Sequence, residues 1–360
     1  MNENRVRLII AGREFEGWKS VRVEAGIERV ARSFDLVITS QWPGQEPPAI
    51  PVAQGDACEL FIGDTKVVTG FVDAIPISYD ATTFEMAVSG RSRTGDLVDC
   101  SVLNSPGQWR GLKVEAVAGA MCRAYGVRVL TETDTGAAIA DHQVQVGESV
   151  FESLDRLMRL RHVLACDDAD GALVIAAPGS GGRAETAIEL GVNVLGASAA
   201  RDYTGVYSEY VCKGQRAGDD DEFGPSVSEA TGSSLQSGLT RRRILVIKQS
   251  GQADSGTCRD RAEYERAHRM GKAHETTYIV SGWRQADGSL WRPNQVVRVR
   301  DSRIGIDADR LIVEVAYLLD ERGLRTQMRL LPQDAFATKP AKQAKAKAKG
   351  GAGVSWADVK

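Results

Sequence analysis

The side chains that most often carry catalysis or bind metals are few in this chain and stand far apart. Its 360 residues include four histidines and six cysteines. They are His142, His162, His268, His274, Cys58, Cys100, Cys122, Cys166, Cys212 and Cys258. No HExxH or CxxC pair occurs among them, and zinc sites are usually built from ligands at such spacings. The sequence therefore predicts no metal site and no cofactor, and the cysteines are expected to be reduced, mostly buried thiols.

Two other patterns imitate catalytic sites. Residues 179–184 match the G-x-G-x-x-A turn of dinucleotide-binding folds and follow an apolar strand. However, Pro178 precedes them, the strand belongs to a hairpin pattern, and the next segment is too short for a packing helix, so a surface loop is favoured. The carboxylates Glu263 and Glu265 could act as glycosidase acids, but such pairs are expected by chance among 48 acidic residues. We expect no enzymatic activity.

Tryptophan side chains could instead form a binding surface. Trp283 and Trp291 flank the turn RQADGS; exposed rings there would suit a glycan, whereas buried rings would form the core of a hairpin. Another tryptophan lies in the C-terminal peptide VSWADVK, which could dock on a partner. The candidate structural or interaction positions are Trp283, Trp291, Arg292, Pro293, Asn294 and Trp356.

Charge separates the C-terminus from the rest of the chain. The formal net charge is −3, but residues 338–360 carry six lysines and one aspartate, so this segment holds +5 and residues 1–337 hold −8. An acidic body argues against broad nucleic-acid binding, which needs a basic face. Residues 337–360 are expected to be a basic flexible tail. The opening segment lacks the apolar core of a secretory signal, and no apolar run is long enough to span a membrane.

The elements that must position these residues are mainly antiparallel strands. From residue 6 to about residue 89, apolar and polar side chains alternate, with turn residues between the runs. One long strand, residues 66–79, is expected to bury most of one face. The apolar side chains of that parity are Val67, Phe71, Ile75, Ile77 and Tyr79.

Amphipathic helices and a hairpin follow. Residues 112–125 have helical apolar spacing, and Gly126 stands where a glycine commonly ends a helix. In the next helix, Ser149 and Glu152 form a capping box. A short hairpin then turns at Asp170, and a charged helix is expected from about residue 258 to residue 274. The fold class is therefore α+β, mainly antiparallel β.

A repeat is visible between the two ends of the chain. The segments ACELFIGD, KVVTGFVDAIPISYD and TFEMAVSGR have the same order of elements as LWRPNQVVRVRD, RLIVEVAYLLD and LRTQMRLLP. Each set reads as a short strand, a longer strand, a tight acidic turn and an alternating strand. This order predicts a duplicated β module, and convergent hairpin patterning is the alternative.

Several long segments resemble the baseplate hub protein of Mu-like contractile-tailed bacteriophages. They are FEGWKSVRVEAGIERVARSFDL, VSGRSRTGDLVDCS, QWRGLKVEAVAGAMCRAYGVRV and GWRQADGSLWRPNQVVRVRD. The resemblance covers residues 1 to about 336. More distantly, the chain is similar to the hub of T-even phages, the late-control tail protein of P2-like phages, and the hub-like part of type VI secretion spikes.

The resemblance implies a structural protein of the virion, made and assembled in the host cytoplasm. Such hubs are homotrimers in which each chain supplies two tail-tube-like β-barrels, giving a pseudo-six-fold ring between the six-fold tail tube and the three-fold central spike. Other baseplate proteins and transiently passing phage DNA are further implied partners. The alternative is a peptidoglycan-degrading or glycan-binding tail component.

The resemblance also implies a division of the chain. The first barrel comprises residues 1–100, and an α/β helical unit comprises residues 101–187, joined by residues 216–275. The second barrel is discontinuous and combines residues 188–215 with residues 276–336.

Overall fold

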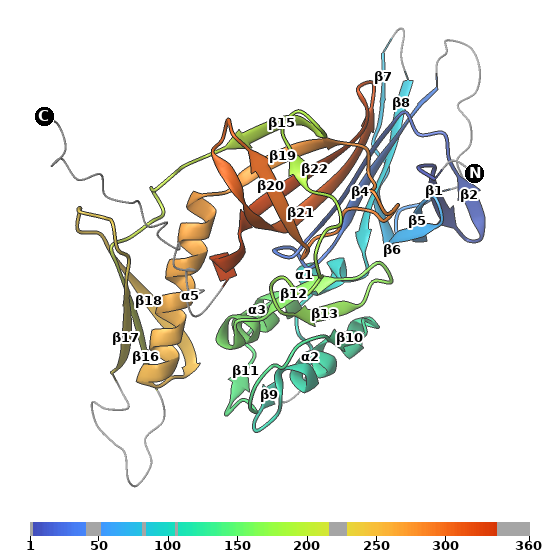
Figure 1. The fold of residues 1–360 in the computed structure, drawn as a ribbon. Coiled ribbons are helices and arrows are strands. Elements are labelled where there is room, and N and C mark those ends of the chain that lie inside the picture. The colour runs from blue at the N-terminus through green and yellow to red at the C-terminus, as the bar shows by residue number, and fades with distance from the viewer. Residues whose placement is uncertain (1–2, 41–51, 81–83, 105–106, 216–228, 337–360) are drawn as a thin grey trace, which may run out of the picture.

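The computed structural model describes residues 3–40, 52–80, 84–104, 107–215 and 229–336 (Figure 1). Most of the strand pairs are antiparallel and the helices are few, so the predicted fold class, mainly antiparallel α+β, is confirmed. No helix of these segments is both long and apolar enough to cross a bilayer.

The N-terminal β module contains the strands β1 to β8, which pair in the order β3-β4-β8-β6-β5-β1-β2, with β7 also on β8. Their bounds are β1 Val6–Ile10, β2 Arg13–Phe15, β3 Ser20–Gly26, β4 Ser33–Ser40, β5 Ala57–Ile62, β6 Thr65–Ala74, β7 Ile77–Tyr79 and β8 Phe84–Ser92. Alternation decides which face is buried: Val6, Leu8 and Ile10 of β1 point into the core.

The long strand expected at residues 66–79 is divided. Pro76 separates β6 from β7 and has no N–H to donate to a strand ladder. The expected buried face also ends early, because Ile77 is 58% exposed and Tyr79 is 81% exposed. The prediction was therefore correct for Val67 and wrong for the two apolar residues of β7.

The C-terminal β module contains six strands in the order β15-β19-β22-β21-β20-β14. Their bounds are β14 Ile188–Glu189, β15 Val194–Ala199, β19 Thr276–Ser281, β20 Val296–Asp301, β21 Ile306–Asp320 and β22 Gly323–Pro332. Strand β21 also pairs with β3, so the two modules form one 14-stranded sheet. In Figure 1 the blue N-terminal strands therefore continue into the orange and red C-terminal strands. Within the described residues this sheet is open and closes no barrel.

An α/β unit follows the N-terminal module. Its elements are α1 Gly95–Asp99, β9 Gln108–Trp109, α2 Val114–Cys122, the 3-10 turn η1 Arg123–Tyr125, β10 Val129–Thr131, β11 His142–Gln143, α3 Val150–Arg161, β12 Leu164–Asp167 and β13 Leu173–Ala176. The predicted capping box of Ser149 and Glu152 begins α3, and Gly126, with φ of 67°, ends the α2–η1 segment. Both predictions are confirmed, as is the hairpin of β12 and β13.

A smaller unit is built around α5. Its elements are β16 Glu209–Gln215, β17 Ala230–Leu235, β18 Ile244–Gln252 and α5 Ser255–Ala273, with the 3-10 turn η2 Gln333–Phe336 against the helix. Strand β16 was expected in the second β module with residues 188–215, but it pairs with β17 and β18 instead. The reason is its buried face: Tyr210 and Cys212 pack under Cys258 and Ala262 of α5.

Candidate assembly site

The two β modules pair their central strands in the same register. Val72 of β6 pairs with Gly90 of β8, and an irregularity in the register follows directly. Ile312 of β21 pairs with Leu330 of β22, and an irregularity follows directly there too. Each number of the second pair is 240 higher than its counterpart, 312 against 72 and 330 against 90. A shared defect at the same position is not expected from convergent hairpins, so this register supports the predicted duplication of the β module.

The correspondence continues through the neighbouring strands. Beyond β8 come β4 and then β3, and beyond β22 come β19 and then β15. On the other side, β5 flanks β6 as β20 flanks β21, and all these pairs are antiparallel. The copies differ at the outer strand, because β1 pairs with β5 antiparallel whereas β14 pairs with β20 parallel. Strands β3 and β15 therefore occupy equivalent positions.

The junction between the modules is the pairing of β3 with the second half of β21. Val23 lies opposite Tyr317, and Val21 lies opposite Leu319. The first half of β21 uses the same edge to pair with β20. Because both valines are buried, the junction joins the apolar faces as well as the backbones, and the two modules share one hydrophobic core.

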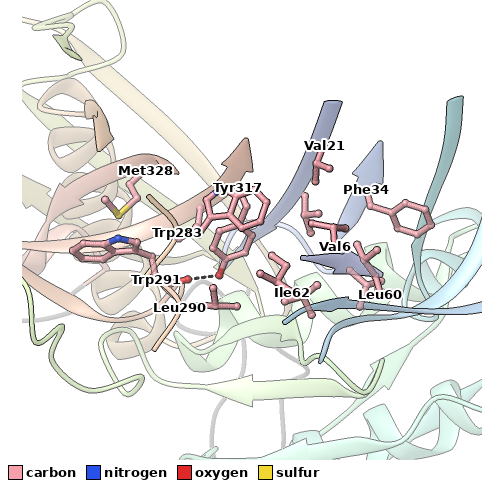
Figure 2. Packing of buried hydrophobic residues seen from close by; sticks show 14 of the residues in the cluster. Val6, Val21, Phe34, Leu60, Ile62, Trp283, Leu290, Trp291, Tyr317 and Met328 are labelled. Carbon is pink, nitrogen blue, oxygen red and sulfur yellow. Dashed lines mark hydrogen bonds between the residues drawn. The ribbon is translucent and has the colours of Figure 1, made fainter. Parts of the chain in front are cut away.

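Aromatic side chains fill the core beside this junction, as Figure 2 shows. The Trp283 indole N–H donates to the carbonyl oxygens of Leu318 and Arg325, both at 3.1 Å. The Tyr317 hydroxyl donates to the carbonyl of Trp291, and the rings of Trp283 and Tyr317 meet edge to face at 6.2 Å. These bonds satisfy the polar ends of two large buried side chains, so each ring can be fully enclosed.

The structure separates the residues that the sequence singled out. Trp283 and Trp291 are 0% and 1% exposed, so they are core residues of the hairpin and cannot contact a glycan or a partner. Arg292 is exposed and Pro293 is half-buried. Trp356 lies outside the described residues.

Asn294 has a local structural role. Its φ of 67° places it in the left-handed region, which Asn tolerates better than most residues. The Asn294 side chain accepts from the Gly179 N–H at 2.6 Å and donates to Ser180 Oγ at 3.0 Å. These bonds fold residues 179–184 against the C-terminal module, so the G-x-G-x-x-A segment is a structural loop that leads into no helix, as expected.

A charged network crosses the junction on the side of α5. Arg329 of β22 binds Glu28 at 2.7 Å, Glu275 at 3.0 Å and Glu314 at 3.2 Å. Burial raises the pKa of Glu28, but Arg329 and Lys272 outweigh it and hold that pKa below its ordinary value. Glu28 follows β3, so this ionised carboxylate ties the N-terminal module to the C-terminal one.

A second ion pair ties the α/β unit to the N-terminal module. The Arg32 guanidinium contacts Asp167 at 3.1 Å, and the Arg32 backbone N–H donates to the same carboxylate at 2.9 Å. The Asp167 side chain is 1% exposed, and burial raises its pKa while Arg32 opposes the shift. Arg32 also donates to the carbonyls of Val67 and Asp167, so one side chain binds both units.

A cleft of about 770 Å³ lies between α3, α5 and the junction. Its walls carry charged groups, but these are paired: Glu265 contacts both Arg261 and Arg269, and Glu28 contacts Arg329. His268 stacks on Tyr264 in the wall, and burial lowers its pKa to about 4. Across the described ranges no three His, Cys, Asp or Glu side chains are arranged to hold a metal ion.

Sequence reasoning missed the residues that build the junction. Tyr317 and Arg329 lie in strands that were predicted, but neither side chain belongs to a motif. Their only signal was the pattern of the C-terminal repeat, which located the strands without identifying the strand that pairs with β21.

Comparisons with known proteins agree with this architecture. Three family models match: Mu phage baseplate assembly protein GpP-like, N-terminal, over residues 5–92; baseplate hub protein gp44-like, second domain, over residues 94–177; and Mu phage baseplate assembly protein GpP, fourth domain, over residues 254–339. The chain is 33% identical over 342 residues to the baseplate hub protein gp44 of Escherichia phage Mu, covering 92% of this chain and 89% of that protein.

Solved structures share the fold. The 43 kDa tail protein of prophage MuSo2 from Shewanella oneidensis has a TM-score of 0.82 and 29% identity, covering 92% of this chain and 99% of the other. The c3393 protein of E. coli, a type VI secretion component with structural similarity to the T4 phage tail proteins gp27 and gp5, has a TM-score of 0.55 and 11% identity, covering 90% and 76%.

The relatives are structural baseplate hub and tail proteins, not enzymes. The sequence identity spans nearly the whole of both chains, and the matched segments include both β modules and the α/β unit between them. The chain therefore belongs to the family of baseplate hub proteins of Mu-like bacteriophages and is a structural component of the phage tail.

Proposed function

We propose that three copies of this chain form a pseudo-six-fold ring in the baseplate. The ring adapts the six-fold tail tube to the three-fold central spike and lines the channel through which DNA leaves the virion. Each β module is one of six tube-like units. Any closure of these units into barrels takes place in the assembled ring.

The observation that supports this proposal most strongly is the repeated β module. The two copies in one chain share strand order and register, and they are joined side by side through β3 and β21. A rotation that relates one module to the next within the chain can continue between chains. Three chains then present six equivalent units on one face while keeping true three-fold symmetry for a three-fold partner.

The proposed division of the chain follows from this role. Residues 1–94 form the first tube-like module, and residues 276–336 with the start of segment 188–215 form the second. Residues 95–187 and 216–275, together with β16, form the units outside the ring wall, and residues 337–360 form a basic tether. The division implied by family resemblance changes in two places, because α1 packs with the α/β unit and β16 pairs in the α5 unit.

The partners follow from the position in the tail. They are a second and a third copy of the chain, the central spike, the tail tube and neighbouring baseplate proteins, with assembly in the host bacterial cytoplasm. Residues 1–337 carry −8 of formal charge, which suits a channel that does not adsorb passing DNA, because like charges repel.

The mass of the purified protein in solution tests the proposal. Static light scattering coupled to size exclusion should give three times the 38.8 kDa mass of the chain. Addition of the cognate spike protein should then shift the trimer to a larger complex. A strict monomer at every concentration, or a stable dimer, would contradict the proposal.

A further inference from the structure

Several strands have an edge without a partner in the described residues, and two of these edges lie at related places in the repeat. Strand β15 ends the 14-stranded sheet and pairs only with β19. Strand β7 pairs only with β8, and its opposite edge is open. Both edges are also apolar: Ile77 and Tyr79 of β7 are exposed, and Leu195 of β15 is 59% exposed. Exposed apolar edges of this kind promote pairing with another strand.

The internal repeat identifies what each open edge is equivalent to. Strand β15 corresponds to β3, because each pairs with the strand that follows in its own module, β19 or β4. Strand β7 corresponds to the second half of β21: Ile77 pairs with Met86 as Tyr317 pairs with Thr326. The partners β3 and β21 are joined within the chain, so the same joint is left unmade once at β15 and once at β7.

The internal joint also predicts a register for the unmade one. Phe34 of β4 pairs with Gly90, and Thr276 of β19 pairs with the equivalent Leu330, so Phe34 and Thr276 correspond. Val23 pairs with Phe34 and Ala199 pairs with Thr276, which places Ala199 at the position of Val23. Because Val23 lies opposite Tyr317, Ala199 should lie opposite Ile77. Because the strands run antiparallel, the next pairs are Ser198 opposite Ser78 and then Ala197 opposite Tyr79.

Side-chain sizes fit this register. At the internal joint, medium-sized valines of β3 face Tyr317 and Leu319. At the unmade joint, the small side chains of Ala197 and Ala199 would face the large ones of Tyr79 and Ile77. An aromatic ring beside an alanine covers the neighbouring backbone and loses its own exposed area, which is the favourable term in strand addition.

We propose that β15 of one chain pairs antiparallel with β7 of the next chain, in the register that sets Ser198 opposite Ser78. This pairing rests on the proposed ring and specifies its interface between copies. Repeated three times, it joins the sheets of three chains into one continuous closed sheet and leaves no open edge at either strand.

Paired cysteines test the register directly. The double variant Ser78→Cys with Ser198→Cys changes two exposed serines by one atom each and should fold normally. Directly opposed residues of antiparallel strands have Cβ atoms close enough for a disulfide once diamide removes the two thiol hydrogens. Non-reducing electrophoresis should then show linked dimers and trimers and nothing larger, since a closed ring has three joints.

Matched controls separate this joint from random collision. The pair Ser78→Cys with Leu195→Cys uses the same two strands and another exposed position, but the residues are three positions out of register. It should give about tenfold less linked protein than the opposed pair, because the Cβ atoms are too far apart. Each single variant and the unchanged chain, with its own six cysteines, report the background.

The outcomes distinguish the joint from the ring itself. Linked trimers from the opposed pair, with little from the control, support the pairing. A trimer by light scattering that gives no link from the opposed pair, or equal links from both pairs, would overturn the pairing and leave the ring proposal standing. A protein that is monomeric in solution would overturn both.

Discussion

The Arg32–Asp167 ion pair makes a sharp prediction about how the α/β unit is held. Replacing Arg32 by Met keeps much of the side-chain volume but removes the guanidinium that lies 3.1 Å from the carboxylate. Asp167 would keep only the backbone N–H of residue 32 among the groups that Arg32 supplies. Breaking a buried pair in this way typically costs about 3–5 kcal/mol of unfolding free energy, and we expect about 3 because that N–H remains.

The pH dependence of this loss has a definite sign. Burial already raises the pKa of Asp167, and losing Arg32 would raise it further. A carboxyl whose pKa is raised in the folded state contributes most below its unfolded pKa, and that contribution is lost as pH rises through the folded pKa. The variant should therefore be closer to wild type at about pH 5 than at about pH 7.5.

Urea unfolding followed by tryptophan fluorescence measures both effects. Asp167→Asn in the same background should recover most of the loss, because the unpaired buried charge is then absent. The matched control is Arg183→Met, which breaks an exposed pair with Asp309 and should cost little or nothing, because solvent screens that pair. The reasoning is refuted if Arg32→Met costs no more than this control, or if its cost is the same at both pH values.

Three further predictions concern packing and pH. Below pH 6.5 the unfolding free energy should fall, because burial lowers the pKa of His142 to about 4. In urea titrations at stepped pH, His142→Gln should remove about 3 kcal/mol of this fall. An unchanged dependence of the unfolding free energy on pH would contradict the prediction. Gly232→Ala places a Cβ 2.2 Å from a backbone nitrogen of α5, so it should lower the unfolding free energy by about 1–3 kcal/mol and lower the Tm measured by circular dichroism. The control Gly119→Ala has open space around it and should be neutral or stabilising. Tyr317→Phe leaves a buried carbonyl of Trp291 without its donor and should cost about 1–3 kcal/mol in urea unfolding; no loss would mean that this bond is unimportant.

Local sequence signals predicted the elements well. Alternation located the strands of both β modules, and a capping box and a terminal glycine located the ends of two helices, because these features depend on near neighbours. The repeat also predicted the duplicated module, since β21 and β22 keep the hairpin pattern of β6 and β8.

The sequence did not predict which distant strands pair with each other. The joint of β3 with β21 consists largely of backbone hydrogen bonds between distant segments, and backbone groups carry no residue-specific signal. The alternation of apolar residues also predicted the wrong burial for Ile77 and Tyr79, because apolar side chains at an open edge alternate in the same way as those in a core. The tryptophans were ambiguous for the same reason, and only their surroundings assign them to the core.

Imaging the purified full-length chain tests the central claim most directly. Electron microscopy should show rings whose projections down the axis have six similar lobes, while three-dimensional reconstruction requires only three copies of the chain and places the α/β units at three positions. A ring built from six copies, a ring without six similar lobes, or the absence of rings at concentrations where the protein is fully folded would contradict the account.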